Sequence, residues 1–424
     1  MTLDGNSMPR SPRLAARLRL TQPRLVELCW VLLVVAISAG LFLVRYEDPH
    51  RIASSGDSYW YMRQAQMFTG VDERTASART SKLVCQDINR SAVDQGQRPT
   101  CRSYPQRGVS ERYIAIFDSR PGYPLLAAPF VKALGPWRGM MVTTMLLAVA
   151  AGLLMYLAVW MALGGRLAGL IATVLLFLLP TGFWMTRMLA EGGVLVGCLG
   201  TLIGVMVLMR GRTAAGLLIA VPALGWTLSA KSANGVALAL VLLVAGLIAL
   251  VTRGANRRGA LVTAALGLAT LSAWFTVSHL LALPSLNETI QDFATRHFKR
   301  PDIPDPYGWL LQQNLDFWPG QIRAALIAPL TLLTTVTAAA ILMLRARHVA
   351  LLWIGVGLSG LALLVAHPIG GEAERLLLPV WLPIAASFGY ATALALGRVT
   401  RPRDAAPESE VEIPRQPIMT ASTR

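Results

Sequence analysis

A short polar segment just after the first long apolar run combines a carboxylate with aromatic rings. Asp57 is followed by Ser58 and then by Tyr59, Trp60 and Tyr61. A carboxylate placed here can take a proton from a hydroxyl group, and the aromatic faces suit sugar rings. Asp is also a common helix N-cap, and both roles are compatible because a carboxylate near a helix N-terminus stays ionised. The segment therefore indicates a catalytic site, a helix start, or both.

Ionisable residues gather where the apolar stretches end, on the side that we expect to be outside the cell. This outer set comprises Asp57, Asp118, Arg120, Arg187, Glu191, Lys231, Glu374 and Arg375. The apolar stretches themselves are nearly free of charge. Ion-coupled transporters normally keep ionisable residues near the bilayer midplane, so the pattern favours chemistry at the outer interface.

The same residues also have structural explanations, which the sequence leaves open. Lys231 and Arg187 fit cationic anchors that reach toward the membrane surface from span ends. Glu374 beside Arg375 fits an exposed ion pair worth less than about 1 kcal/mol. Glu191 fits a simple cap of the fourth span.

A site of this kind suits the transfer of a sugar from a polyprenyl phosphate. The leaving group is a phosphate, whose charge needs Lys or Arg. We predict Asp57 as the base that deprotonates the acceptor hydroxyl, with inversion at the sugar carbon. Lys231 and Arg375 are predicted to clamp the phosphate. Arg120 and Arg187 are further cations for substrate binding, and Glu191 and Glu374 are also predicted to bind substrate.

The elements that position these residues are predicted to be membrane-spanning helices. Hydrophobic residues make up 54% of the 424 positions, charged residues 15%, and the mean hydropathy is +0.51. A helix needs about 20 apolar residues to cross the hydrocarbon layer. Ten candidate stretches lie near 27–45, 138–163, 167–182, 190–209, 213–229, 235–251, 259–282, 322–344, 348–366 and 376–397. We therefore expect an all-α, multi-pass membrane protein.

The distribution of arginine sets the expected orientation. The net charge is +16, but the arginines fall before the first span and in every second gap, which is the positive-inside pattern. This puts both termini in the cytoplasm, most simply at the plasma membrane of a bacterium. Nucleic acid is not an expected partner, because no basic face is interleaved with aromatic residues.

The segments between the spans differ in length and character. We expect a basic cytoplasmic tail over 1–25, a membrane domain over 26–397, and a disordered cytoplasmic tail over 398–424. The first outer loop, 46–136, is predicted to start with a short helix on the membrane surface and to hold a flexible insert around 70–110. The second long outer loop, 284–321, is rich in Pro and aromatic residues and fits either an interfacial belt or a lid.

The cysteine and histidine residues do not indicate a metal site. Cys85 and Cys101 share the first outer loop, where they form either a disulfide or two free thiols. No histidine has the spacing of a zinc ligand, so no metal site is predicted from the residues.

Five motifs, taken in chain order, resemble those of the C-type (GT-C) membrane glycosyltransferases, in particular the protein O-mannosyltransferases and the aminoarabinose transferase that modifies lipid A. Asp57-Ser58-Tyr59-Trp60-Tyr61 resembles their acidic motif, and Arg120-Pro121-Gly122-Tyr123-Pro124-Leu125-Leu126 resembles the start of their next span. Further matches are Pro180 through Ala190-Glu191, Ala230-Lys231-Ser232, and Glu374-Arg375-Leu376-Leu377-Leu378-Pro379.

This resemblance implies a GT-C-like fold and a lipid-phosphate sugar as donor, with a membrane lipid, glycan or protein as acceptor. Some members of the family bind a divalent cation beside the acidic motif, so a divalent cation is a possible cofactor. The alternatives from other classes are a transporter of lipid or lipid-linked glycan, and a non-catalytic scaffold of cell-envelope assembly.

Overall fold

The computed structural model describes residues 12–46, 53–54, 56–105, 109–252 and 256–397, with side chains from Leu25 onward. These residues form helices joined by turns, and they contain no strand. The all-α class is thereby confirmed for the part of the chain that is described.

Eight helical segments among the described residues are long and apolar enough to cross a membrane. They lie in α1 (Pro12–Tyr46), α6 (Pro136–Leu163), α9 (Glu191–Met209), α10 (Thr213–Ala230), α11 (Ser232–Val251), α12 (Arg257–Leu280), α16 (Arg347–Ala366), and the segment Leu378–Ala395, which ends in α18 (Trp381–Ala395). The chain is therefore a multi-pass membrane protein by the length and composition of its helices.

Two of the ten predicted spans are broken. The stretch predicted at 167–182 consists of α7 (Arg166–Leu178), with 13 residues, and the short α8 (Pro180–Met185). The stretch at 322–344 is divided between α14 (Pro306–Ile327) and α15 (Leu330–Arg345), which meet at 83° and count as one further span if taken together. Pro180 and Pro329 stand at these breaks, as expected for a residue that cannot continue a helical hydrogen-bond ladder.

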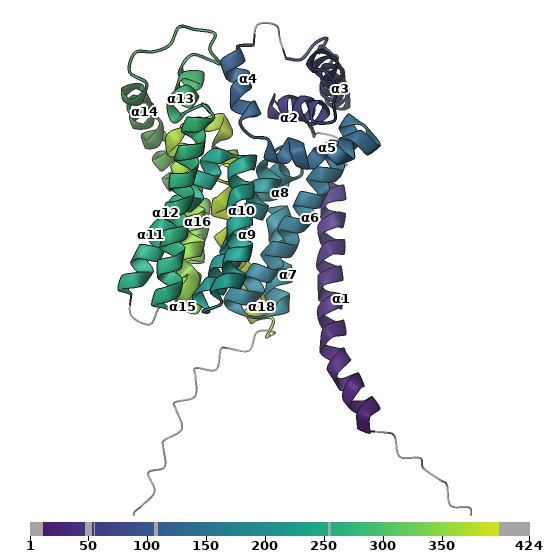
Figure 1. Ribbon diagram of the computed structural model, residues 1–424, viewed down its shortest axis with the longest axis vertical. Helices are drawn as coiled ribbons and strands as arrows, with labels where there is room; N and C mark the ends of the chain where they lie inside the picture. Colours follow the sequence, from purple (N-terminus) through teal and green to yellow (C-terminus); the bar gives the residue numbers. More distant parts are fainter. Residues whose placement is uncertain (1–11, 47–52, 55, 106–108, 253–255, 398–424) are drawn as a thin grey trace, which may run out of the picture.

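The two ends of the helix bundle differ (Figure 1). At one end, α1 starts and α18 finishes. We call this the arginine end, because Arg166 pairs there with Glu27 and Arg210 donates to the carbonyl of Met161. The opposite end, which we call the loop end, carries the helices of the two long predicted loops.

The first predicted loop is folded. It contains α2 (Gly56–Met67), α3 (Glu73–Asp94), α4 (Glu111–Asp118) and α5 (Gly122–Leu134). The prediction of a flexible insert around 70–110 is wrong, since α3 occupies most of that range. Cys85 and Cys101 form a disulfide across it, with their Cα atoms 5.2 Å apart.

The helix α2 also differs from the prediction of a helix lying on the membrane surface. Every residue from Ser58 to Gln66 is buried, and α2 contacts α3, α4, α5 and α6. The second predicted loop is largely helical too, with α13 (Leu286–Ala294) and α14.

The most buried span is α9, and small residues bring its neighbour α10 close. A Cβ atom built on Gly197 would lie 1.9 Å from Thr227 Oγ1, and one on Gly204 would lie 2.6 Å from the backbone nitrogen of Ala220. Small residues at helix interfaces are the usual means of close packing in membranes. Because α9 begins with Glu191, this packing also fixes the carboxylate at the loop end.

Candidate functional site

Four charged residues at the loop end form a continuous chain of ion pairs. Arg375 donates from Nη2 to Asp57 Oδ2 and from Nε to Glu191 Oε1. Lys231 Nζ donates to the same Glu191 oxygen at 3.1 Å. We call these four residues the ion-pair chain. All of them were predicted as site residues from the sequence, and the fold brings them into direct contact.

Each member is positioned by a helix end. Asp57 lies in the first turn of α2, and Glu191 is the first residue of α9, where the helix dipole favours a negative charge. Lys231 is the extended residue between α10 and α11, with φ −159° and ψ 95°. Arg375 lies in the single turn α17 (Ala373–Leu376), between the 3-10 turns η1 (Gly370–Glu372) and η2 (Leu378–Val380).

The simpler structural explanations fail for Asp57, for Glu191 and for the pairing of Glu374 with Arg375. The helix α2 begins at Gly56, so Asp57 is not its N-cap. The N-cap of α9 is Ala190, and the Glu191 carboxylate bonds to side chains instead. Glu374 is exposed and forms no pair with Arg375, so the predicted exposed ion pair is wrong and Glu374 does not join the chain.

Burial differs among the members of the ion-pair chain, and Asp57 is the most exposed of them. The exposed fraction of the side chain is 20% for Asp57, 13% for Lys231, 7% for Arg375 and 2% for Glu191. Burial lowers the pKa of Lys231 although Glu191 raises it. Burial also opposes the charge of Arg375, but Asp57 and Glu191 outweigh it and hold its pKa well above the usual value. Asp57 is therefore the carboxylate of the chain that a solute can reach.

Two further predicted cations lie beside the ion-pair chain without joining it. Nε of Arg120 and Nε of Arg187 are buried and have no hydrogen-bond partner among the described residues. The guanidinium carbons of Arg187 and Arg375 lie 5.2 Å and 5.9 Å from the Trp184 ring centroid. Burial lowers the pKa of Arg187, and the charge of Arg375 lowers it further.

A close contact between helices sets the place of Arg120. It precedes α5, where a Cβ atom on Gly122 would lie 2.9 Å from the backbone nitrogen of Ala230. Ala230 is the residue before Lys231, so the start of α5 packs against the junction that carries the ammonium group. With two carboxylates and four cations, this group of six residues has a formal charge of +2.

The three aromatic residues after Asp57 form packing contacts rather than open faces. Tyr59, Trp60 and Tyr61 are 4%, 5% and 0% exposed. Trp60 stacks on Phe117, with ring centroids 5.6 Å apart, and Tyr61 meets Tyr123 edge to face at 5.5 Å. These rings do not present faces to a sugar in this structure, and instead hold α2 against α4 and α5.

Tyr61 nonetheless reaches the charged group through its hydroxyl. The hydroxyl is buried and has no hydrogen-bond partner among the described residues. Burial raises its pKa to about 12, with Arg120 opposing and Asp57 and Glu191 adding to the shift. The hydroxyl is thus a neutral hydrogen-bond donor next to the cations.

A second arginine with two carboxylates joins the two long predicted loops, and sequence reasoning missed it. Arg112 of α4 bonds through Nε to Glu288 at 2.9 Å and through Nη1 to Asp302 at 2.9 Å. Its guanidinium carbon lies 4.3 Å from the Phe298 ring centroid. We call Arg112, Glu288 and Asp302 the outer clamp. It places the segment around α13 beside α4, the arrangement that the lid alternative requires.

Two other features bear on ligands. Trp184 was not predicted as a site residue. It lies three residues before Arg187, and the guanidinium groups of Arg187 and Arg375 both lie against its ring. Within the described ranges, no group of three or more His, Cys, Asp or Glu residues could hold a metal ion. The possible divalent cation therefore has no candidate ligand set in this part of the chain.

Comparison with known proteins adds no assignment. No protein family, curated protein or solved structure matches this chain. Its function therefore has to be argued from the site itself.

Proposed function

We propose that this chain is a GT-C-like glycosyltransferase that moves a sugar from a polyprenyl-phosphate donor to an acceptor, with inversion. In this proposal ten membrane crossings place both termini in the cytoplasm of a bacterium and the loop end outside its plasma membrane. The acceptor is a lipid, glycan or protein that reaches the loop end.

One observation carries the proposal. A partly exposed carboxylate, Asp57, lies in a group with surplus positive charge, in which the buried Nε atoms of Arg120 and Arg187 have no partner in the described part of the chain. Buried polar groups are normally hydrogen-bonded, so these two guanidinium groups are suited to an anion that the protein does not itself supply. A phosphate diester has the charge and the acceptor oxygens for them.

The residues that we assign to the donor phosphate therefore differ from those predicted from the sequence. Lys231 and Arg375 are already neutralised by Glu191 and Asp57, so we assign the donor phosphate to Arg120 and Arg187. The Tyr61 hydroxyl is a further donor for the same ligand. Lys231 and Arg375 then act as positioning residues that hold the two carboxylates.

The reaction that follows is a single displacement. The acceptor oxygen forms a bond to the anomeric carbon, and the bond from that carbon to the phosphate oxygen breaks. The hydroxyl proton passes to Asp57, and polyprenyl phosphate leaves with a negative charge that Arg120 and Arg187 stabilise. Glu191 is too deeply buried for the base role, with 2% of its side chain exposed.

The first experiment follows transfer of a radiolabelled sugar from undecaprenyl phosphate in membranes containing the full chain, with hexose and pentose donors tested in parallel. We expect Asp57→Asn to lower transfer about a hundredfold or more, as loss of a general base does. Glu374→Gln is the matched control, because this exposed carboxylate lies next to Arg375 without pairing to it. Equal transfer by wild type and Asp57→Asn would remove Asp57 as the base.

A binding measurement separates the phosphate assignment from the chemistry. Undecaprenyl phosphate without a sugar is titrated into the purified chain, and Arg120→Gln or Arg187→Gln is each expected to weaken binding about tenfold. Arg300→Gln, which changes an exposed cation at the loop end, controls for charge. Reconstituted vesicles that moved intact lipid-linked sugar without cleaving it would support the transporter instead.

A further inference from the structure

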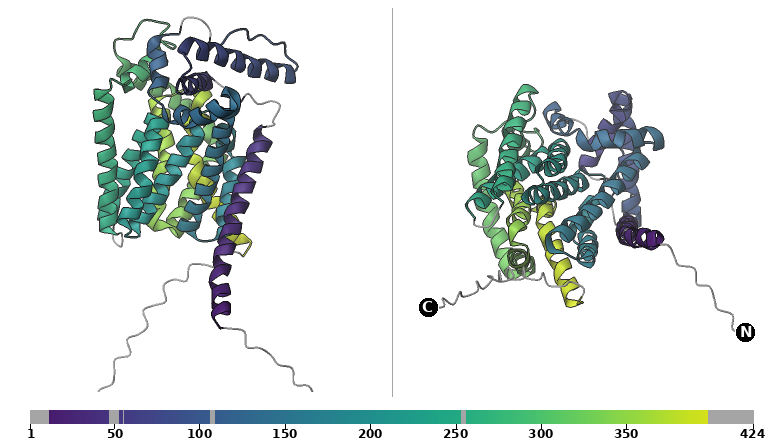
Figure 2. Two further views of the ribbon diagram at one scale, coloured as in Figure 1. Left: turned by 45° about the vertical axis from the view of Figure 1, so that its right-hand side comes forward. Right: turned by 60° about the horizontal axis from the view of Figure 1, so that its bottom comes forward.

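The outward face of α3 carries a row of polar side chains that the proposed transfer reaction does not use. Arg79, Lys82, Gln86 and Arg90 follow the spacing i, i+3, i+7 and i+11 and are all exposed. Residues at this spacing lie on one side of a helix. The left view of Figure 2 shows α3 lying across the top of the loop end. The row extends over about 17 Å of helix.

Two of the three cations of this row, Arg79 and Lys82, are not neutralised within α3, whereas Arg90 pairs with Asp87 of the same helix at 2.6 Å. No acidic residue stands three or four positions from Arg79 or Lys82, and neither forms an ion pair among the described residues. They are also three positions from each other, where like charges disfavour the helix. Stability of α3 therefore does not account for this pair of charges, which an anionic partner would offset.

The helix is held firmly in place beneath the row. The Cys85–Cys101 disulfide closes the segment, and both the amide and the carbonyl oxygen of Asn89 bond to the backbone of Cys101 at 2.9 Å. Buried Asp87 accepts from the backbone and hydroxyl of Ser54 at 2.9 and 2.8 Å. The disulfide also brings the exposed Arg102 alongside α3.

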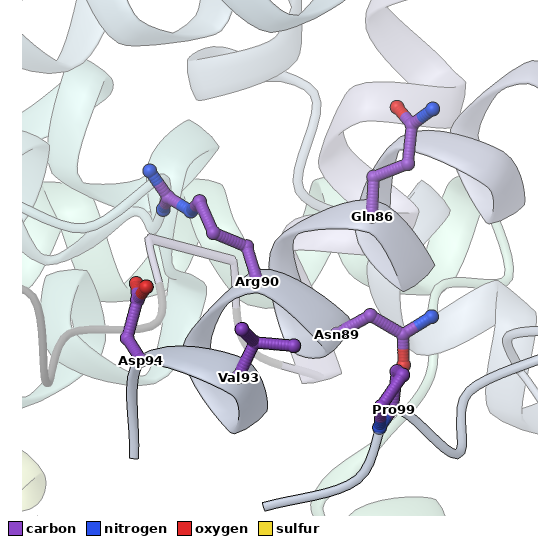
Figure 3. A pocket seen from close by; sticks show the side chains of 6 residues that line it. All are labelled: Gln86, Asn89, Arg90, Val93, Asp94 and Pro99. Carbon is purple, nitrogen blue, oxygen red and sulfur yellow. The ribbon is translucent and has the colours of Figure 1, made fainter. Parts of the chain in front are cut away.

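A small pocket lies at the end of the row (Figure 3). It is lined by Gln86, Asn89, Arg90, Val93, Asp94 and Pro99. The lining combines the Gln86 amide and the Asp94 carboxylate with an apolar surface from Val93 and Pro99. The Asn89 amide is bonded to the backbone of Cys101, and the Arg90 guanidinium to Asp87. Such a mixture of a few directed polar groups with an apolar surface is typical of small-ligand sites, and it matches the alternating hydroxyl groups and apolar faces of a pyranose ring.

From this face we propose that α3 binds a linear acidic polysaccharide. One sugar ring occupies the pocket at Gln86 and Arg90, and the acidic groups of neighbouring sugars lie along Arg79, Lys82 and Arg102. This proposal concerns polysaccharide binding alone and does not depend on the proposed transferase activity.

Other partners fit this face less well. Protein interfaces have apolar cores rich in aromatic residues, whereas Val93 is the one large apolar side chain exposed on α3. The apolar side chains of α3, such as Ala76 and Val84, are turned inward and buried, so the helix has no apolar face for a bilayer. No aromatic residue stands in α3 for the stacking that single-stranded nucleic acid requires.

The test measures binding of polygalacturonate to the purified full chain at low salt. Neutral dextran serves as the uncharged sugar polymer and polyglutamate as the acidic polymer without sugar. We expect polygalacturonate to bind more tightly than either, and added salt to weaken it. Absence of polygalacturonate binding, or equal binding of dextran, would overturn the proposal.

Variants then locate the site. Arg79→Ala/Lys82→Ala/Arg102→Ala is expected to weaken polygalacturonate binding about tenfold. Arg74→Ala/Lys299→Ala/Arg300→Ala, which removes three exposed cations outside the row, should leave it unchanged, and thermal melts check that both variants fold. Gln86→Ala should weaken binding of polygalacturonate and not of polyglutamate. If the two triple variants lose binding equally, or Gln86→Ala affects both polymers alike, general charge attraction replaces the proposed site.

Discussion

The ion-pair chain and the outer clamp use the same chemistry in two different surroundings. Each has one arginine that pairs with two carboxylates far from it in the sequence: Arg375 joins Asp57 and Glu191, and Arg112 joins Glu288 and Asp302. The exposed fraction of the side chain is 7% for Arg375 and 41% for Arg112. Burial, rather than the residue types, separates the two.

This difference assigns them different tasks. In the interior, leaving one charge without its partner is costly, so such a group holds its elements in one arrangement. The ion-pair chain also contains Lys231, so that its two cations, Lys231 and Arg375, balance its two carboxylates. The outer clamp is exposed to solvent, and exposed ion pairs usually contribute less than about 1 kcal/mol. A contact that breaks at so small a cost would suit the lid alternative.

The largest expected effect comes from removing the central carboxylate of the interior group. Glu191→Gln leaves the half-buried Lys231 without its carboxylate and takes one of two carboxylates from the buried Arg375, and we expect it to lower the free energy of unfolding by about 3 kcal/mol or more. Glu374→Gln, at an exposed carboxylate of the same loop end, should change it by less than about 0.5 kcal/mol. Equilibrium unfolding in detergent measures both. Similar losses for the two variants would contradict the distinction between buried and exposed charge.

A smaller effect is expected at the outer clamp. Arg112→Ala should lower the free energy of unfolding by about 1 kcal/mol or less, and the loss should shrink in high salt because exposed charges are screened. The Glu191→Gln effect should persist in the same buffer. Lys299→Ala removes a nearby exposed cation that forms no ion pair among the described residues and is the control. If the loss for Arg112→Ala did not change with salt, the outer clamp would be behaving like the buried ion-pair chain and not like an exposed contact.

The sequence predicted the members of the ion-pair chain but not their pairing. Asp57, Glu191, Lys231 and Arg375 stand out because charge is rare beside apolar spans and favours their ends. Their partners depend on where the short turn α17 lies, and Arg375 is 318 residues from Asp57. Local patterns contain no information about a contact over that distance. The outer clamp was missed for the same reason.

The error over α3 has a different cause. Its buried positions include Ala76, Thr80, Asp87 and Ser91, which are small or polar. The helical repeat is therefore invisible to a search for apolar periodicity. The local start signal was present, since Asp72 caps the helix by accepting from the backbone nitrogen of Thr75 at 3.0 Å. The disulfide and the Asp87 hydrogen bonds then supplement the few apolar contacts that α3 makes through residues such as Val84.

The smallest predicted effect is a pH dependence of the segment that follows α13. His297 and its neighbours Arg296 and Phe298 have φ values of 62°, 56° and 55°, a conformation that non-glycine residues rarely adopt. His297 Nδ1 lies 3.0 Å from Asp292 Oδ1, and this hydrogen bond raises the pKa of His297 above its usual 6.5. The stabilisation is therefore complete below about pH 6.5 and is lost as the pH rises through the higher folded-state value.

The variant His297→Gln keeps a hydrogen-bonding side chain without the titrating charge. Wild type should exceed it in thermal stability at pH 5.5, by less than about 1 kcal/mol as for other exposed pairs, and the difference should fall as the pH approaches 9. Melting curves of both proteins across this range measure it. A difference that stays constant with pH would mean that the His297 charge does not hold the α13 segment.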